Sequence, residues 1–277
     1  MSKTILVAGK NSNDGEKFSD GLAFTSRKVV MTEREDNYID SDEDDLSLKK
    51  KTIAERKAEV EAFEEEKKLQ SQTGICTFPW NPSSALSARN LVLQTENFFE
   101  KMDEAVLYFD EEYFASNAQP FEPEEIARSC DELILGFQYL TSEIINRFER
   151  KNNSSEPGSL VFLIKEGPCA LDALKSPAVK NGSVPIASPL VAAAAAAFTS
   201  FAENICAVYS KEDFLNIYLV RGDSTFDEAR KDDTIGKWLG NYLDAAESSN
   251  GKQKKNFQWI KIGAKPSGSG FSLFRKK

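Results

Sequence analysis

The sequence contains no histidine. This absence removes the commonest general base, the commonest metal ligand and the partner that activates serine or cysteine in most nucleophilic enzymes. It argues against hydrolases and against zinc enzymes, so we expect no metal site.

Cysteine is scarce, and its four positions are far apart: Cys76, Cys130, Cys169 and Cys206. None of them forms a CxxC pair, the spacing that many metal and redox sites use. Isolated cysteines are typical of reduced thiols in the core of a cytosolic protein. We therefore expect buried thiols and a cytoplasmic location.

Long apolar runs and clustered basic residues are also missing. The apolar run at residues 5–8 is too short for a signal sequence, and we expect no later segment to approach the length of a membrane span. A formal charge of -9 disfavours nucleic acid or an anionic membrane as a partner, because phosphate groups are bound by clustered lysine and arginine.

The residues that are present alternate between strand and helix patterns. We expect strands at residues 5–8, 27–32, 74–80, 104–109, 158–165, 214–220 and 257–263, with helices between them. Ser188 and Pro189 form the N-cap and first turn of an alanine-rich helix. This alternation predicts one Rossmann-like α/β domain over residues 1–277, with a doubly wound parallel sheet of about seven strands.

Two segments interrupt the alternation. Residues 33–70 form an acidic and charged insertion, either a solvated excursion or a dedicated binding arm. Residues 168–187 form a loop rich in proline, glycine and serine.

The stretch "AGKNSNDG" resembles the opening motif of the short-chain dehydrogenase/reductase family, a Thr-Gly, three residues and a Gly-x-Gly. Gly9 and Gly15 match the outer glycines, and Asn13, which tolerates a left-handed backbone, stands at the middle one. Gly136 in the helix at 122–150 and Gly222 in "LVRGDS" extend the similarity. The resemblance implies a site for NAD(P) made by a set of loop residues: Gly9, Lys10, Asn11, Ser12, Asn13 and Gly15.

The catalytic residues that the resemblance implies are replaced. The family's Tyr falls on Ala187 or Ser188, its Lys on Val191 or Ala192, its Asn on Leu133 and its Ser on Lys165. None of the seven tyrosines has a lysine four or seven residues further on. Asp14 and three carboxylates at residues 110–112 add negative charge where the cofactor would lie, and Lys10 offsets part of it. We therefore expect either no cofactor or NAD(P).

These residues favour a family-like protein that is catalytically inactive and has a structural or regulatory role. The alternative is an NAD(P)-dependent oxidoreductase with a rebuilt active site, in which Lys165 replaces the missing acid or orients a carbonyl; Lys165 is otherwise a surface lysine at a strand end. A third possibility is a module that binds another small molecule in the crevice.

Assembly is the remaining expectation. The helix at 122–150 carries apolar residues on more than one side: Leu133, Leu135, Phe137, Leu140, Ile144, Ile145 and Phe148. The helix at 188–209 contains a narrow alanine run. Family members pair through these two helices, so we expect a homo-oligomer or a complex with a related chain; the alternative is that the alanine helix packs only within its own subunit.

Overall fold

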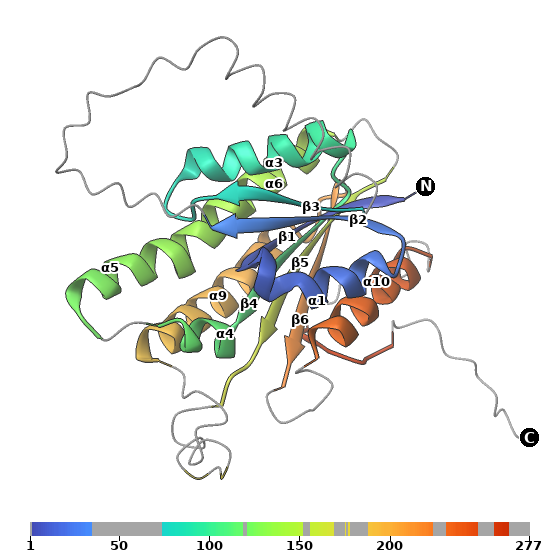
Figure 1. Ribbon diagram of the computed structural model, residues 1–277. Coiled ribbons are helices and arrows are strands. Elements are labelled where there is room, and N and C mark those ends of the chain that lie inside the picture. The colour runs from blue at the N-terminus through green and yellow to red at the C-terminus, as the bar shows by residue number, and fades with distance from the viewer. Residues whose placement is uncertain are drawn as a thin grey trace, which may run out of the picture.

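The computed structural model describes residues 2–34, 74–118, 121–151, 156–168, 175, 177, 188–223, 231–248 and 258–265. Most of the predicted insertion at 33–70 and of the predicted loop at 168–187, together with Cys169 and Ala187, lies outside these residues. The described part has a parallel sheet in the order β3-β2-β1-β4-β5-β6-β7, with helices on both faces (Figure 1). The predicted doubly wound sheet of seven strands is confirmed.

Five strands run close to the predicted segments, whereas β1 is longer than the predicted 5–8 and β7 is shorter than the predicted 257–263. Their bounds are β1 Lys3–Asn11, β2 Arg27–Arg34, β3 Ile75–Trp80, β4 Glu104–Asp110, β5 Gly158–Lys165, β6 Leu215–Gly222 and β7 Ile260–Lys261. Every residue of β4 is buried, as expected for a strand covered on both faces. The chain order reverses between β1 and β4, so ligands are expected beyond the carboxyl ends of these two strands.

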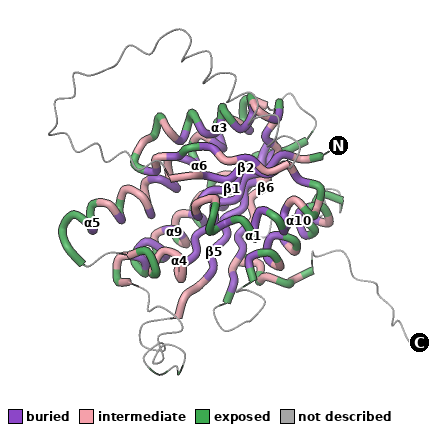
Figure 2. The backbone as a smooth tube through the Cα atoms, viewed as in Figure 1, coloured by how far each residue is buried: buried purple, intermediate pink, exposed green. Residues whose placement is uncertain are grey.

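Helices form a layer on each face of the sheet. Their bounds are α1 Ser12–Ala23, α3 Ala85–Phe99, α4 Glu111–Ser116, α5 Pro123–Cys130, α6 Gly136–Arg150, α9 Pro189–Val208 and α10 Asp232–Ser248. A π-helical segment, η1 Asp131–Leu135, joins α5 to α6. Helices α1 and α10 pack on one hydrophobic core, and α3, α6 and α9 pack on the other (Figure 2).

Helices α1 and α10 approach each other through glycines. A Cβ at Gly236 would overlap the backbone oxygen of Phe18, and a Cβ at Gly21 would overlap the backbone oxygen of Asp233. Such contacts leave no room for a side chain at either position. The start of α10 is therefore held firmly against α1.

Helix α9 begins as predicted, because the Ser188 hydroxyl accepts a hydrogen bond from the Val191 amide and Pro189 occupies the first turn. By length and composition alone, α9 is also apolar enough to cross a membrane, which corrects the expectation that no segment approaches a span. A helix that packs on the core of a soluble protein passes the same test, so this is weak evidence for a membrane.

Two expectations about burial change. Cys76 and Cys206 are buried as predicted, but Cys130 is exposed at the end of α5. Most apolar residues of η1 and α6 are buried within the chain itself, including Leu133, Phe137 and Ile144, whereas Leu135 is partly exposed. The buried residues need no partner chain, so the exposed alanines of α9 are the main reason to expect pairing.

Candidate functional site

Strand β1 continues into helix α1 without an intervening loop. Asn11 is both the last residue of the strand and the N-cap of the helix, and Asn13 lies in the first helical turn. The expected left-handed turn at Asn13 is therefore wrong. The register between β1 and β2 shifts after Val7, so that Asn11 pairs with Thr32, and this irregularity replaces the expected loop.

The two glycines of the motif serve packing. Gly9 has a φ of +140°, and a Cβ there would overlap the carbonyl oxygen of Tyr108 on β4. Gly15 faces the end of the Met31 side chain on β2. Both glycines therefore bring α1 and β1 close to their neighbours.

The remaining motif residues point in different directions. The Ser12 hydroxyl donates a hydrogen bond to the Glu33 carboxylate. Asn13 and Asp14 are exposed, and the Asn11 side chain accepts a hydrogen bond from the Arg34 amide. Lys10 is buried, and its ammonium group pairs with Asp110 and Asp232.

A buried ion cluster lies where β1, β4, β5 and α10 meet. Lys10 Nζ is 2.6 Å from Asp110 Oδ2 and 2.6 Å from Asp232 Oδ2. Lys165 Nζ is 3.1 Å from Asp110 Oδ2 and 3.5 Å from Asp232 Oδ1. The Tyr108 hydroxyl donates to Asp232 Oδ1 over 2.9 Å. We call these five residues the strand-end cluster.

In the strand-end cluster, the effect of opposite charges on the pKa values of Lys10 and Asp110 is larger than the effect of burial. Burial lowers the pKa of Lys10, but the carboxylates of Asp110 and Asp232 raise it above its ordinary value. Burial likewise raises the pKa of Asp110, but Lys10 and Lys165 bring it below its ordinary value. Burial and both carboxylates raise the pKa of Tyr108, which stays a hydrogen-bond donor.

Asp110 also caps α4, since its Oδ1 accepts hydrogen bonds from the amides of Glu112 and Tyr113. The charge of Asp110 is paired with two buried lysines, whereas the sequence-based expectation had it facing a cofactor. Glu111 lies beside it with a half-buried carboxyl that accepts a hydrogen bond from the Gly167 amide, and burial raises its pKa to about 6.

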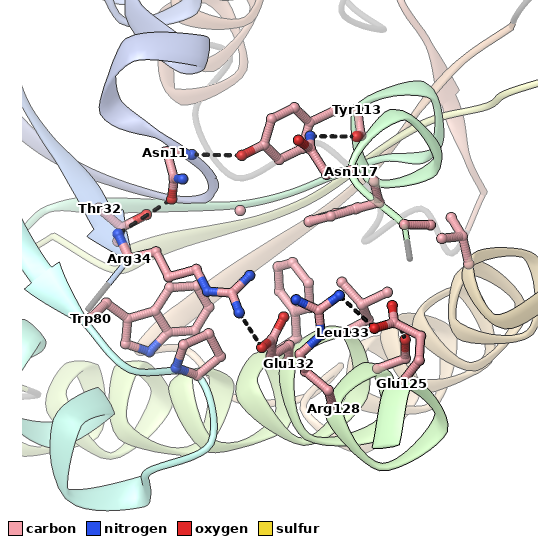
Figure 3. Close-up of a pocket in the computed structure, with 17 residues that line it drawn as sticks. Asn11, Thr32, Arg34, Trp80, Tyr113, Asn117, Glu125, Arg128, Glu132 and Leu133 are labelled. Carbon is pink, nitrogen blue, oxygen red and sulfur yellow. Dashed lines mark hydrogen bonds and ion pairs between the residues drawn. The ribbon is translucent and has the colours of Figure 1, made fainter. Parts of the chain in front are cut away.

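Figure 3 shows a cavity of about 310 Å³. One of its lining residues, Tyr113, has its ring centroid 5.6 Å from Lys10 Nζ of the strand-end cluster. The cavity lies beyond the carboxyl ends of β1, β2 and β3 and is closed by α4, α5 and η1. Its polar and aromatic lining includes Asn11, Thr32, Arg34, Trp80, Tyr113, Asn117, Glu125, Arg128 and Glu132. This is the place that the strand order indicates for a ligand.

Two arginine–carboxylate pairs face this cavity. Arg34 at the end of β2 pairs with Glu132 in η1, and the Nε of Arg128 donates to Glu125 over 2.9 Å within α5 (Figure 3). The π-helical segment supplies Glu132, and π-helical turns occur frequently at functional sites. The cavity therefore combines bound charges of both signs with aromatic side chains.

The sequence matches no known family model and no curated protein. Solved structures are similar over almost the whole chain. NADH-dependent reductase A1-R' complexed with NAD superposes with a TM-score of 0.55 at 15% identity, covering 94% of this chain and 95% of that one. A short-chain dehydrogenase/reductase from Brucella melitensis gives 0.55 at 13% identity, covering 94% of both chains.

The fold is that of the short-chain dehydrogenases/reductases. An alcohol dehydrogenase from the archaeon Thermococcus sibiricus, complexed with 5-hydroxy-NADP, agrees, with a TM-score of 0.54 at 10% identity and coverage of 95% of this chain and 96% of that one. At these identities the likeness concerns the fold.

The positions that the short-chain dehydrogenase/reductase resemblance assigns to catalysis divide into two groups. Leu133 and Val191 line the cavity and, with Phe137, form an apolar wall. Ser188 caps α9, and Lys165 belongs to the strand-end cluster.

Gly136, a glycine that extends the resemblance, packs its α-carbon against Pro82.

Sequence reasoning missed several residues of the site. Arg34 and Trp80 are the last residues of their strands, a position that could have indicated them. Tyr108 points to the same side of β4 as Asp110, which the sequence did indicate, and the two-residue period of a strand could have indicated Tyr108 as well. Asp232 gave no local signal, because its partner Lys10 is 222 residues away.

Proposed function

We propose that this protein is a ligand-binding protein with the short-chain dehydrogenase/reductase fold that does not transfer hydride and has a structural or regulatory role. The apolar wall of Leu133, Phe137 and Val191 carries the proposal. Hydride transfer in the family requires a tyrosine whose pKa is lowered by a lysine one helical turn away. Side chains of leucine, phenylalanine and valine neither hold nor move a proton.

Chemistry on Lys165 is the rival function. Lys165 lies at the carboxyl end of β5, but its ammonium is within 3.1 Å of Asp110 and 3.5 Å of Asp232. An acid or carbonyl-orienting group must direct a hydrogen at the substrate. The engagement of Lys165 with two buried carboxylates favours binding without chemistry.

The cavity suits a small molecule. Its volume of about 310 Å³ lies at the lower end of the range of ligand sites, and it combines one apolar wall with many polar and charged side chains. Solved structures of the same fold hold NAD or an NADP derivative, so NAD(P) is the first ligand to test.

An activity assay tests the absence of hydride transfer. We expect no NADH or NADPH consumption above the uncatalysed rate with a panel of aldehydes and ketones. Steady consumption that is lost in Lys165→Met but kept in Lys261→Met would establish the rival function. Lys261 is a suitable control because it is an exposed lysine at the end of β7.

A thermal-shift screen tests ligand binding. A ligand present at about 100 times its dissociation constant stabilises a protein by about 2.7 kcal/mol. We expect a ligand of the cavity to stabilise the wild type but not Arg34→Met, which changes a residue of the lining. It should still stabilise the control Arg89→Met, which changes an exposed arginine on α3. Equal shifts in both variants would place the ligand elsewhere.

A further inference from the structure

We propose that Lys10, Lys165 and Tyr108 form an anion-binding site whose occupant is the chain's own Asp232. The inference concerns the strand-end cluster and does not depend on whether the neighbouring cavity binds a ligand. It assigns to Asp232 the role that a bound carboxylate would have.

The contacts of Asp232 are those of a bound anion. Its Oδ2 lies 2.6 Å from Lys10, and its Oδ1 accepts from Tyr108 over 2.9 Å and faces Lys165 at 3.5 Å. These three partners come from β1, β4 and β5, whereas Asp232 comes from α10. One carboxylate thus meets two ammonium groups and one hydroxyl from three different strands.

Asp110 is the less suitable candidate for this role. Its Oδ1 caps α4 through the amides of Glu112 and Tyr113, so Asp110 has a structural task beside its ion pairs. With Asp232 removed, Asp110 would still neutralise one of the two lysines. The other lysine would be left without a full counter-charge, and a buried charge in that state favours uptake of an anion.

The backbone at Asp232 is positioned independently of its carboxylate. Gly236, one turn later in α10, touches the backbone of Phe18, and this contact fixes the start of the helix. Removal of the Asp232 carboxylate should therefore leave a gap of its own size in an otherwise preserved site. Formate has the size and charge that fit this gap.

A small ion can reach the site. The side chains of Lys10, Lys165 and Asp232 retain exposed fractions of 7%, 8% and 10%. Tyr113, a residue of the cavity lining, has its ring centroid 5.6 Å from Lys10 Nζ. The strand-end cluster thus lies close to one wall of the cavity, and its side chains are not fully enclosed.

Chemical rescue of Asp232→Ala tests the proposal. We expect the variant to melt roughly 10 °C below the wild type, because a buried ion pair is broken. Sodium formate, at ionic strength held constant with sodium chloride, should raise its Tm by several degrees in a saturable way. Formamide, which has the same shape and no charge, should not.

Two controls separate anion binding from general effects. Asp233→Ala removes an equal charge from the same helical turn, but Asp233 is exposed, so formate should leave its Tm unchanged. The wild type should also be unaffected, because its site is occupied. If formate also stabilised the wild type or Asp233→Ala by the same amount, the proposal would be wrong.

Two further outcomes of the rescue experiment would overturn the proposal. Equal rescue by formate and formamide would reduce the effect to cavity filling, and no rescue would show that the lysines need no anion; either result overturns the proposal. If Asp232→Ala does not accumulate in soluble form, its soluble yield on refolding with formate or with formamide gives the same comparison.

Discussion

Gly9 combines a positive φ with a close contact to a neighbouring strand. Its φ is +140°, and a Cβ at this position would overlap the carbonyl oxygen of Tyr108. Gly74 also has a positive φ, +74°, but no atom lies near the place of its Cβ. A substitution at Gly74 therefore introduces backbone strain alone, whereas a substitution at Gly9 introduces both strain and a steric collision.

We expect Gly9→Ala to lower the free energy of unfolding by more than about 3 kcal/mol and Gly74→Ala to lower it by about 1 kcal/mol. The larger loss arises because β1 and β4 must move apart to admit the methyl group. Urea unfolding followed by tryptophan fluorescence measures both values. Equal losses would mean that the β1–β4 contact yields without cost.

Glu111 gives a pH-dependent prediction at the same scale. Burial raises its pKa from 4.5 to about 6, so the folded state binds the proton more tightly than the unfolded chain. The ionised carboxylate destabilises the fold, and this penalty is absent below the unfolded pKa and complete above the folded pKa. Stability from this group thus falls as the pH rises through the window from 4.5 to 6.

Glu111→Gln removes the ionisable group and keeps an acceptor for the Gly167 amide. As the pH rises through this window, we expect the free energy of unfolding of the variant to increase relative to that of the wild type. The increase should be on the order of 1 kcal/mol, because the side chain is partly solvated. Urea midpoints of both proteins across the window measure the difference. A difference that does not change with pH contradicts the prediction.

At the scale of elements, the contact between α1 and α10 depends on backbone meeting backbone. Gly236 touches the backbone of Phe18, whereas Gly15 in the same helix pair faces only the flexible end of Met31. Alanine favours a helix over glycine by about 1 kcal/mol at either position. Only the Gly236 contact must open to admit a methyl group.

We therefore expect Gly236→Ala to destabilise the protein by about 2–4 kcal/mol and Gly15→Ala to be close to neutral. Thermal unfolding of the two variants beside the wild type gives the comparison. A neutral Gly236→Ala variant would show that α10 shifts on α1 without loss.

Local signals explain which elements could be predicted from the sequence. The apolar run of β5 and the Ser-Pro start of α9 gave bounds that the structure confirms. The junction of β1 and α1 was wrong, because two glycines that serve packing resemble the glycines of a loop. The strand-end cluster could not be predicted, since Asp232 and Lys10 meet only through the complete fold.

At the scale of the whole molecule, pairing through α9 stays a prediction. Its outward positions Ala192, Ala193 and Ala196 are exposed, and an alanine face permits close approach of a second helix. Leu133, Phe137 and Ala195 are buried in the chain, so substitutions there would not test pairing.

We expect light scattering at high micromolar concentration to show a dimer or larger assembly. Ala196→Glu should shift it towards the monomer, because an unpaired charge in an interface costs several kcal/mol, about 3 or more. Asn97→Glu adds the same charge on the exposed face of α3 and should have no effect. A wild-type protein that stays monomeric rules this mode out.

The place of β1 in the sheet has a consequence for synthesis on the ribosome. β1 is made first, yet it lies between β2 and β4, so one of its edges remains open until the residues from Glu104 onward have emerged. Open strand edges promote association of nascent chains. Lys10 also waits for Asp232, its second counter-ion, until most of the chain has been translated.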